Sequence, residues 1–434
     1  MTRIATLGTA AILLLLLGCG SSATSTATSA TTDCSVEGQD SQILAVMQSW
    51  YYWYQSLPAS VDPSAYSSSE AFLDALREQP LDRFSYLTTQ AADQAFYGAG
   101  QYVGFGFGSE LTSSNDLQVT QVFPASPAAQ AGLARGDTVT GLNGTPVPTL
   151  VASGQLDAAL SVSGPGTSLG IAFTDLAGVS HSTTLVSAVV TQPSVAITTT
   201  LEQGGTKVGY VLFNSFIDTS TALLDQAFGQ FRGEGVTELV MDERYNGGGE
   251  VSVAQHLGSL ILGNGYSGKT MGVLTFNDKH ADQNQTELFQ TVTNPLNLTR
   301  VVFITTQSTA SASEFTINGL VPYLHVVTVG SATFGKPVGE QGFNICANVL
   351  YPITFKITNA VGYGDYFDGL PATCPAPDDL THPLGDPREA SLAAALAYLE
   401  RGGCGSASPE RAVREGLRPR RPMRYTFRQL VNAY

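Results

Sequence analysis

The C-terminal half of the chain alternates short apolar stretches of strand type and helix type, and this alternation constrains the fold more than any other feature. In chain order the stretches are Val208–Phe213, Leu223–Phe231, Thr237–Met241, Ala254–Leu262, Val301–Thr305, Glu314–Val321, Val326–Val329, Ile353–Ile357 and Leu392–Leu399. Strands separated by helical patterns indicate a mixed sheet packed with helices. No repeat of solenoid or propeller period is present. The pattern predicts an α/β core over residues 191–402.

Two earlier segments follow different patterns. Residues 41–97 place apolar side chains such as Ile43 and Met47 at helical spacing, which predicts a helical segment. After a glycine-rich boundary, residues 98–190 show short alternating strands around a helix-like stretch at Ala125–Leu133. The sequence therefore predicts an α/β and α+β multidomain chain with a helical N-terminal segment, a β-rich domain and a mixed α/β-sheet core.

Charge divides the chain into an acidic body and a basic end. The 434 residues carry a formal net charge of −15, with 43% hydrophobic and 13% charged residues, which indicates an acidic globular body. Such a body is a poor partner for nucleic acid. Residues 403–434 differ, because positions 405–434 contain seven arginines and two glutamates. We treat residues 403–434 as a separate Arg-rich C-terminal tail.

The N-terminus has the features of an export signal. Residues 1–18 combine Arg3 with the apolar run Ala10–Leu17, which is too short to span a bilayer comfortably. The run closes on Leu-Leu-Gly before Cys19, and this resembles the lipobox of bacterial lipoproteins, in which the cysteine receives the lipid. Residues 19–40 begin as a Ser/Thr-rich tether. We expect a lipid-anchored, extracytoplasmic protein of the bacterial cell envelope; an ordinary cleaved signal with a chance cysteine is the alternative.

The remaining cysteines are even in number, as expected for disulfides in an exported protein. They are Cys34, Cys346, Cys374 and Cys404. Three pairings are possible, and we favour Cys346 with Cys374, which share one turn-rich stretch, leaving Cys34 with Cys404; free thiols are the alternative. No C-x-x-C or histidine spacing predicts a metal site, and we expect no cofactor.

Two glycine-containing signatures mark residues 98–190. The first runs Tyr102-Val103-Gly104-Phe105-Gly106-Phe107, and the second is Ser126-Pro127-Ala128-Ala129-Gln130-Ala131-Gly132-Leu133. Together they resemble a PDZ domain. The resemblance implies that backbone N–H groups of the turn Gly104, Phe105, Gly106 and Phe107 bind the carboxylate of a protein or peptide with a free apolar C-terminus. A structural spacer without a ligand is the alternative.

Polar residues that suit catalysis gather at two strand-to-helix turns and near one lysine. Arg244-Tyr245-Asn246-Gly247-Gly248-Gly249 exposes backbone N–H groups that suit an oxyanion, and Ser311-Ala312-Ser313-Glu314 opens a helix. Lys336 follows an apolar strand, and a lysine in an apolar site can lose its proton and act as a base. A Ser–His–Asp triad that uses His280 with Asp278 or Asp282 is an alternative.

The spacing of these turns is similar to that of the C-terminal processing peptidases, also called tail-specific proteases. The resemblance covers residues 41 to 402 and includes the segment Asp82–Leu87. It implies that Ser311 is the nucleophile and Lys336 the base, with an oxyanion hole made by Ala312 and by Gly247 or Gly248. Ser313 is the competing nucleophile.

One position departs from that family. Many relatives have Gln four residues after the lysine, where this chain has Glu340 followed by Gln341. A carboxylate beside Lys336 raises the pKa of the lysine and opposes its role as base. Either Gln341 turns inward at a local bulge or Glu340 orients the lysine, and the sequence leaves both open.

These features predict a secreted, lipid-anchored serine endopeptidase with a Ser–Lys dyad that recognises the C-terminal ends of proteins. The alternatives are a non-catalytic peptide-binding lipoprotein with the same fold and an envelope scaffold whose basic tail binds anionic polymer. The chain also ends in a mildly apolar Leu430-Val431-Asn432-Ala433-Tyr434 with a free carboxylate. The tail could therefore act as a ligand of its own PDZ-like turn; a solvated tail or contact with anionic polymer is the other expectation.

Overall fold

The computed structural model describes residues 33–404, except 113, and Tyr434. The predicted signal, Cys19, most of the predicted tether and all of the Arg-rich tail except its last residue lie outside the described residues. Within residues 33–404 and Tyr434, no helix is both long enough and apolar enough to cross a membrane.

The N-terminal segment is helical but also contributes a strand to the core. Its helices are α1 (Val36–Trp50), α2 (Ser69–Leu76) and α3 (Gln90–Ala99), with short 3₁₀ turns η1 (Tyr54–Ser56) and η2 (Pro63–Ala65). Helix α1 starts inside the predicted tether, because the Ser35 hydroxyl accepts the Gly38 N–H at 3.1 Å and caps it. Strand β1 (Tyr86–Thr89) lies within the range predicted as helical. It pairs with β19 (Asn348–Tyr351), which pairs with β18 (Phe343–Ile345).

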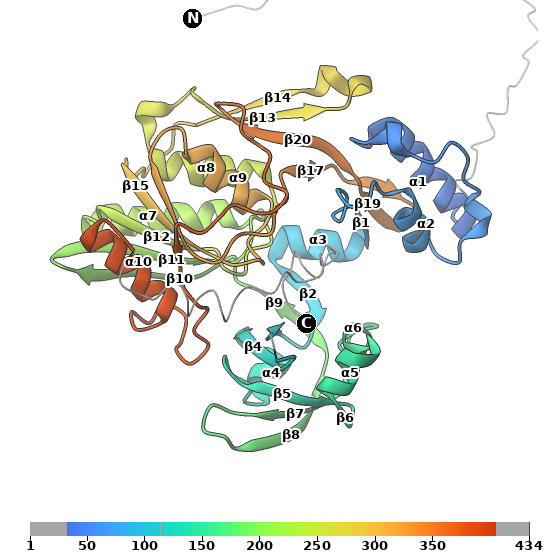
Figure 1. Ribbon diagram of the computed structural model, residues 1–434, viewed down its shortest axis with the longest axis horizontal. Coiled ribbons are helices and arrows are strands. Elements are labelled where there is room, and N and C mark those ends of the chain that lie inside the picture. The colour runs from blue at the N-terminus through green and yellow to red at the C-terminus, as the bar shows by residue number, and fades with distance from the viewer. Residues whose placement is uncertain (1–32, 113, 405–433) are drawn as a thin grey trace, which may run out of the picture. The chain divides into compact units, whose positions relative to one another are not determined.

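Residues 101–191 form a β-rich unit, here called the inserted domain, between that segment and the core. Its strands are β2 (Gln101–Gly104), β3 (Phe107–Leu111), β4 (Leu117–Val122), β5 (Thr138–Leu142), β6 (Thr145–Pro146), β7 (Ser168–Thr174), β8 (Ser180–Val186) and β9 (Ala188–Thr191), and its helices are α4 (Pro127–Gln130), α5 (Val147–Ser153) and α6 (Leu156–Ala159). Strands β2 and β9 pair, and the main sheet runs β3-β4-β5-β7-β8 (Figure 1). Strand β3 therefore lies at an edge of its sheet.

The core is built on a six-stranded sheet whose central strands are buried on both faces. Its order is β10 (Val195–Gln203), β11 (Thr206–Phe213), β12 (Glu238–Asp242), β15 (Arg300–Thr305), β16 (His325–Gly330) and β21 (Cys374–Pro375). Only β10–β11 is antiparallel; the other four pairings are parallel. Parallel strands that are buried on both faces have continuous apolar sequences, and the strands of this sheet show such runs.

Successive residues of these strands point to opposite helical layers. Val211 and Phe213 pack with the helices α7 (Ser220–Glu234), α8 (Val251–Leu262) and α9 (Ala312–Leu320). Tyr210 and Leu212 pack instead with α10 (Ala390–Arg401) on the other face (Figure 1). The predicted fold class, a multidomain chain with a mixed α/β core, is confirmed.

A second core sheet supports the loop that carries Lys336. It runs β14 (Gln285–Leu288), β13 (Thr270–Phe276), β20 (Ile353–Asn359) and β17 (Val338–Glu340), with the 3₁₀ turns η3 (Asn264–Tyr266) and η4 (Asp278–Gln283) nearby in sequence. Because β17 begins two residues after Lys336, the sheet fixes the direction in which the chain leaves the lysine.

All four predicted cysteines form disulfides, but our preferred pairing is wrong. The bonds are Cys34–Cys346 and Cys374–Cys404, with Cα–Cα distances of 5.9 and 5.4 Å. Strand β18 ends next to Cys346 and packs against α1, which brings that cysteine to Cys34. Cys374 lies instead on β21 beside β16, in the layer that α10 covers, and Cys404 follows α10.

Candidate active site

Ser311 lies at the start of helix α9 in a strained backbone conformation. Its φ is +56°, in the left-handed region that residues other than glycine rarely adopt. Such a conformation costs on the order of 1–3 kcal/mol and is concentrated at functional sites. The residue is 9% exposed, at the N-terminus of a helix whose residues are all buried. The turn thus presents one serine at the positive end of a helix dipole.

Lys336 lies on the loop between β16 and β17 and is 2% exposed. The loop is held from the N-terminal segment by Arg83, whose guanidinium donates to the carbonyl oxygens of Phe334 and Phe367, both at 2.9 Å. The same guanidinium lies 5.0 Å from the centre of the Phe334 ring. A buried ammonium on a fixed loop has little access to water, so its charge depends on its neighbours.

Glu314 connects the serine turn to the lysine loop. Its carboxylate accepts the backbone N–H groups of Ser311 (2.9 Å), Gly335 (2.7 Å) and Lys336 (2.8 Å), and the Thr333 hydroxyl at 2.5 Å. Burial raises the pKa of this carboxyl, and the four hydrogen bonds oppose the rise. The sequence analysis singled out Glu314 only as part of the motif. Its spacing from Ser311, which is that of a capping box, was the available signal.

Glu340 is the carboxylate that faces the lysine. Lys336 Nζ and Glu340 Oε1 form an ion pair, and the register shifts between Gly339 and Glu340 where β17 pairs with β20. Burial lowers the pKa of Lys336, while the charge of Glu340 raises it. Burial also raises the pKa of Glu340, and Lys336 lowers it. Burial therefore moves the two pKa values toward each other. It lowers the free-energy cost of the state in which Lys336 is unprotonated and Glu340 is protonated.

Ser311 and Lys336 line one small cavity. Its volume is about 60 Å³, and its lining comprises Tyr86, Tyr97, Gly249, Ser311, Lys336, Glu340 and Tyr351. The tyrosines come from β1, α3 and β19, so the N-terminal segment closes one side of the cavity. Burial raises the pKa of Tyr97 and Tyr351, which keeps both phenols neutral. The sequence analysis missed these tyrosines, because Tyr86 and Tyr97 lie more than 250 residues before Tyr351 and no motif joins the three.

The glycine turn packs directly against the serine turn. Gly248 has φ +105°, and a Cβ there would lie 2.8 Å from the Ser311 Cβ and 3.0 Å from the Ala312 nitrogen. Its N–H donates to Asn246 Oδ1 at 2.9 Å, so this predicted oxyanion donor already has a partner. Among the residues described, the N–H groups of Ala312 and Gly249 donate no hydrogen bond. Gly249 lines the cavity and Ala312 follows Ser311 in the chain; the sequence analysis assigned the donor to Gly247 or Gly248, although the matched turn also contains Gly249.

The competing nucleophile and the alternative triad lie elsewhere. Ser313 is fully buried, and its hydroxyl donates to the Asn246 carbonyl at 3.2 Å. His280 stacks on Trp50 with ring centres 3.5 Å apart and shares a hydrogen bond with Ser49 Oγ at 3.0 Å. These contacts place His280 against α1 and not beside Ser311.

A buried ionic cluster holds the start of the glycine turn. Arg244 is fully buried and pairs with Asp242, Asp378 and Glu389 at 2.8, 2.8 and 2.9 Å. Arg135 of the inserted domain joins the same cluster, because its guanidinium donates to Asp378 at 2.6 Å and to the Tyr245 hydroxyl at 2.5 Å. One arginine thus connects the inserted domain to the residue that follows Arg244.

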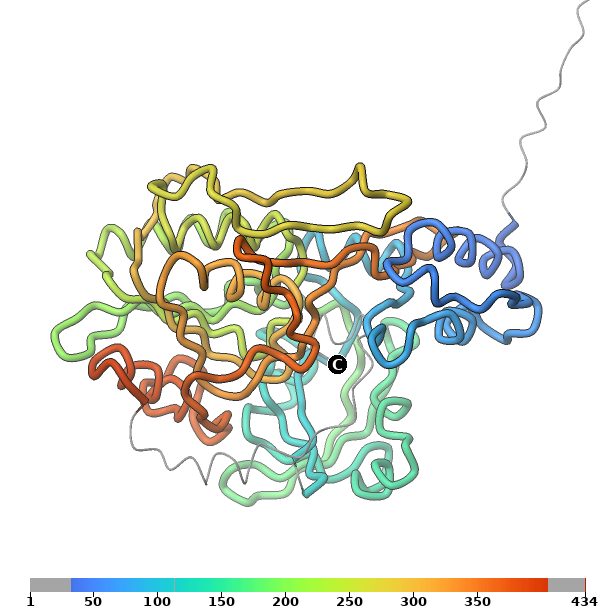
Figure 2. The backbone as a smooth tube through the Cα atoms, turned by 45° about the horizontal axis from the view of Figure 1, so that its top comes forward, coloured from blue at the N-terminus to red at the C-terminus, as the bar shows by residue number. Residues whose placement is uncertain are grey.

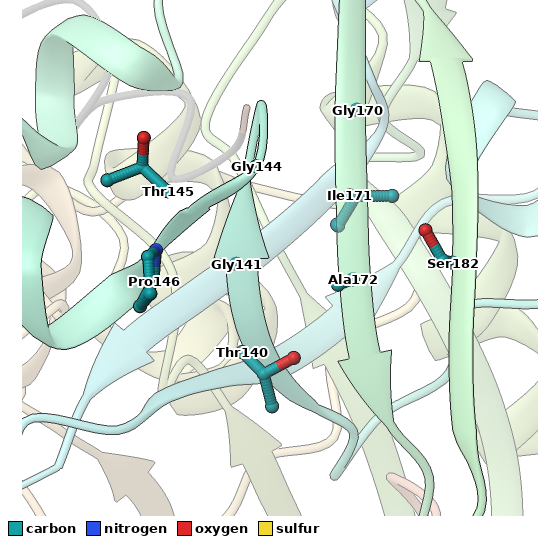
Figure 3. Close-up of a pocket in the computed structure, with 9 residues that line it drawn as sticks. All are labelled: Thr140, Gly141, Gly144, Thr145, Pro146, Gly170, Ile171, Ala172 and Ser182. Atoms are coloured by element: carbon teal, nitrogen blue, oxygen red, sulfur yellow. The ribbon is translucent and has the colours of Figure 1, made fainter.

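A second pocket, on the inserted domain, differs in its chemistry. A larger pocket of about 230 Å³ lies on the inserted domain, lined by Thr140, Gly141, Gly144, Thr145, Pro146, Gly170, Ile171, Ala172 and Ser182 (Figure 3). None of these side chains is ionisable, so the pocket has no group for acid–base work. No group of three or more His, Cys, Asp or Glu in residues 33–404, apart from 113, is placed to hold a metal ion.

Comparison with known families agrees with this geometry. The chain matches the peptidase S41 N-terminal domain over residues 38–86 and peptidase family S41 over residues 207–360. Over these two segments the chain is similar to peptidase family S41. The second match contains the glycine turn, Ser311, Lys336 and Glu340, whereas residues 101–191 lie between the two matches.

Relatives extend the S41 likeness along most of the fold. A carboxyl-terminal-processing protease of Picosynechococcus sp. is 28% identical over 253 residues, which cover 57% of each chain. The crystal structure described as an S41 protease from Bacteroides fragilis is similar to this chain, with a TM-score of 0.65 and 26% identity. The similarity covers 82% of this chain and 96% of that one. The photosystem II D1 C-terminal processing protease shares the fold, with a TM-score of 0.51 and 20% identity over 78% and 92%. The chain spans little more than half the length of the curated relatives it matches.

Proposed function

We propose that the chain is a serine endopeptidase in which Ser311 is the nucleophile and Lys336 the general base. The observation that carries the proposal is that the strained serine and the buried lysine line one cavity while a single carboxylate, Glu314, holds both backbones. A catalytic pair needs fixed geometry and a base that can lose its proton, and both conditions have a physical source in these residues.

The reaction follows from these positions. Neutral Lys336 Nζ takes the proton of the Ser311 hydroxyl as Oγ attacks the peptide carbonyl, and the carbonyl oxygen becomes an oxyanion. The N–H groups of Ala312 and Gly249 stabilise that oxygen; one such donor is worth on the order of 3 kcal/mol of barrier. Lys336 then protonates the leaving amine. Water, deprotonated by the same lysine, hydrolyses the acyl-enzyme and restores the serine.

Substrate recruitment is assigned to the inserted domain. Gly106 has φ +90° between β2 and β3, and the N–H groups of Gly106 and Phe107 face one place beside the open edge of β3. We assign this turn to the free C-terminal carboxylate of a protein substrate, as in a PDZ domain, with the preceding residues of the substrate added along β3.

Anchoring to the membrane through a lipid on Cys19 completes the proposal and places the enzyme outside the cytoplasm. Its support is the sequence Leu16-Leu17-Gly18-Cys19 after a short apolar run, together with the two disulfides, which persist in oxidising compartments. Metabolic labelling with a fatty acid should tag the wild-type chain and not Cys19→Ser.

The activity is tested with an unfolded reporter protein that ends in an apolar residue. The wild-type chain should cleave it, and Ser311→Ala should not, whereas Ser313→Ala should keep at least about a tenth of the rate because the Ser313 hydroxyl bonds the Asn246 carbonyl and does not line the cavity. Binding without cleavage by the wild-type chain would favour the non-catalytic peptide-binding protein instead.

A further inference from the structure

The glycine turn of the inserted domain holds the last residue of this same chain. The Gly106 N–H donates to the Tyr434 carboxyl oxygen at 2.6 Å, and the Phe107 N–H lies 3.3 Å from that oxygen. In return, the Tyr434 N–H donates to the Phe107 carbonyl at 2.8 Å. Two residues that exchange such bonds form an antiparallel pair, so Tyr434 extends the sheet at its open β3 edge. Figures 1 and 2 mark this chain end beside the inserted domain.

Two glycines shape the turn that holds the terminus. A Cβ at Gly104 would lie 2.8 Å from the carboxyl carbon of Tyr434. A Cβ at Gly106 would lie 2.0 Å from the Ser126 Cβ, on the side where α4 begins. The turn is therefore shaped for a carboxylate at Gly104, with helix α4 supporting it from behind.

The side chain of the terminal residue is also recognised. Tyr434 is half-buried and packs against the apolar cluster of the inserted domain, and its ring centre lies 6.0 Å from that of Phe107. The site thus selects two features of one residue, a free carboxylate and a large apolar side chain.

The chain is long enough for this contact to be internal. Cys404 is fixed to Cys374 on β21 by a disulfide, and Tyr434 follows thirty residues later. An extended chain covers about 3.3–3.6 Å per residue, so thirty residues reach about 100 Å at most. A ligand tethered in this way has an effective concentration on the order of millimolar.

We propose that the C-terminal tyrosine is the internal ligand of the inserted domain, and that an incoming protein must displace it with its own free C-terminus bearing a large apolar residue. The effect on hydrolysis rests on the proposed peptidase function, whereas the binding contact does not. The tail then discriminates among substrates, because only a substrate C-terminus that binds the turn tightly can displace the tethered Tyr434.

Binding is tested in the full Ser311→Ala chain, which cannot consume the probe. The probe is a fluorescent peptide of residues 425–434, measured by anisotropy against the full chain and against a chain that ends at Ala433. The shortened chain should bind it at least about tenfold more tightly, because the tethered competitor then ends in Ala and lacks the large side chain. An amidated probe should bind the shortened chain at least about tenfold more weakly than the free acid. Equal affinity for the full and shortened chains would overturn the proposal, as would equal binding of both probes.

Hydrogen exchange measures the contact of Tyr434 with Gly106 and Phe107 directly. The amides of Gly106 and Phe107 should be protected in the full chain and exchange at least about tenfold faster in the chain that ends at Ala433. Tyr434→Phe keeps the ring and the carboxylate and should retain the protection. Protection should not change when the protein is diluted a hundredfold. Loss of protection on dilution would mean that the terminus of a second copy fills the turn, which contradicts an internal ligand.

Hydrolysis separates this proposal from the proposed function. Removing Tyr434 should lower KM at least about threefold for a reporter ending in free Tyr and leave KM unchanged for the same reporter amidated. If the wild-type chain cleaves neither reporter, the peptidase assignment fails while the binding and exchange results still decide the internal ligand. If the enzyme is active and removing Tyr434 leaves KM for the free-acid reporter unchanged, the proposal of an internal ligand is wrong.

Discussion

Glu314 Oε2 accepts the backbone N–H of Lys336 at 2.8 Å, across 22 residues of sequence. The same oxygen accepts the N–H of Ser311 at 2.9 Å. One buried carboxylate therefore fixes both loops of the proposed catalytic pair while touching neither reacting atom. We describe Glu314 as a positioning residue, and its position predicts how its removal should act.

Glu314→Gln should reduce both stability and turnover. An amide replaces one acceptor oxygen by a donor, which then faces N–H groups that have lost their partner, at a cost of about 3 kcal/mol in the free energy of unfolding. Urea denaturation measures this cost. Glu202→Gln, on an exposed strand residue, serves as the control and should change the free energy of unfolding by less than about 0.5 kcal/mol.

Kinetics distinguish positioning from stability alone. At a temperature where Glu314→Gln is fully folded, kcat should fall by about a hundredfold or more with KM little changed, because the serine and lysine lose their relative placement. A folded Glu314→Gln with wild-type kcat would show that the carboxylate only stabilises the fold.

The Lys336–Glu340 pair predicts how activity depends on pH. The base form of Lys336 is required, so kcat/KM should rise with pH through the pKa of the lysine. The charge of Glu340 raises that pKa. Glu340→Gln removes the charge, so the midpoint of the profile should move to lower pH by about one unit or more, and activity below the wild-type midpoint should increase.

Ionisation of Glu250 near the cavity must be distinguished from the shift of the pH profile that Glu340→Gln causes. Burial and the neighbouring Asp218 raise the pKa of Glu250 to about 7, and Glu250 follows Gly249 in the glycine turn. Glu250→Gln should remove any inflection near pH 7 while leaving the displacement caused by Glu340→Gln intact. A wild-type midpoint in Glu340→Gln would mean that the carboxylate does not control the lysine.

Sequence reasoning located the local parts of this molecule well. The strand and helix ranges of the core were predictable because strands such as β11 and β15, buried on both faces, leave continuous apolar runs, and α7 leaves a helical pattern. The placement of Ser311 before helix α9 and of Lys336 after strand β16 was predictable because each lies in a short motif. In these cases a few neighbouring residues determine the structure.

Contacts between distant residues were not predictable in the same way. The disulfide between Cys34 and Cys346 spans 312 residues, and nothing near either cysteine specifies the packing of α1 on β18 that joins them. Strand β1 was read as helical, because its pairing partner β19 lies more than 250 residues later. The tyrosines of the cavity were missed for the same reason.

The Ser–Lys pair predicts non-additive losses. Ser311→Ala and Lys336→Ala should each abolish peptide hydrolysis, and the double variant should be no slower than either, because the two residues act in one proton transfer. Activity should also be insensitive to chelators. Single-turnover assays on the purified variants measure this. Appreciable turnover by Lys336→Ala, or loss of activity on chelation, would exclude the Ser–Lys mechanism.

Arg135 should couple the inserted domain to the active site. Its buried guanidinium contacts Asp378 and Tyr245 and also donates to the Thr120 carbonyl at 2.6 Å. Arg135→Ala removes one donor from each of these acceptors, although Asp378 keeps Arg244, and should lower the free energy of unfolding by about 3 kcal/mol. It should also lower kcat/KM by at least about tenfold, because Tyr245 begins the turn that carries Gly249. Arg135→Lys keeps the charge but cannot reach several acceptors at once, so its losses should be intermediate.

Arg388→Ala is the matched control. The Arg388 side chain pairs with Asp386 and is 76% exposed, so its removal should change the free energy of unfolding by less than about 1 kcal/mol. Urea denaturation and peptide hydrolysis of all three variants decide the matter: if Arg135→Ala behaves like Arg388→Ala in both assays, the inserted domain is not coupled to the glycine turn through this residue.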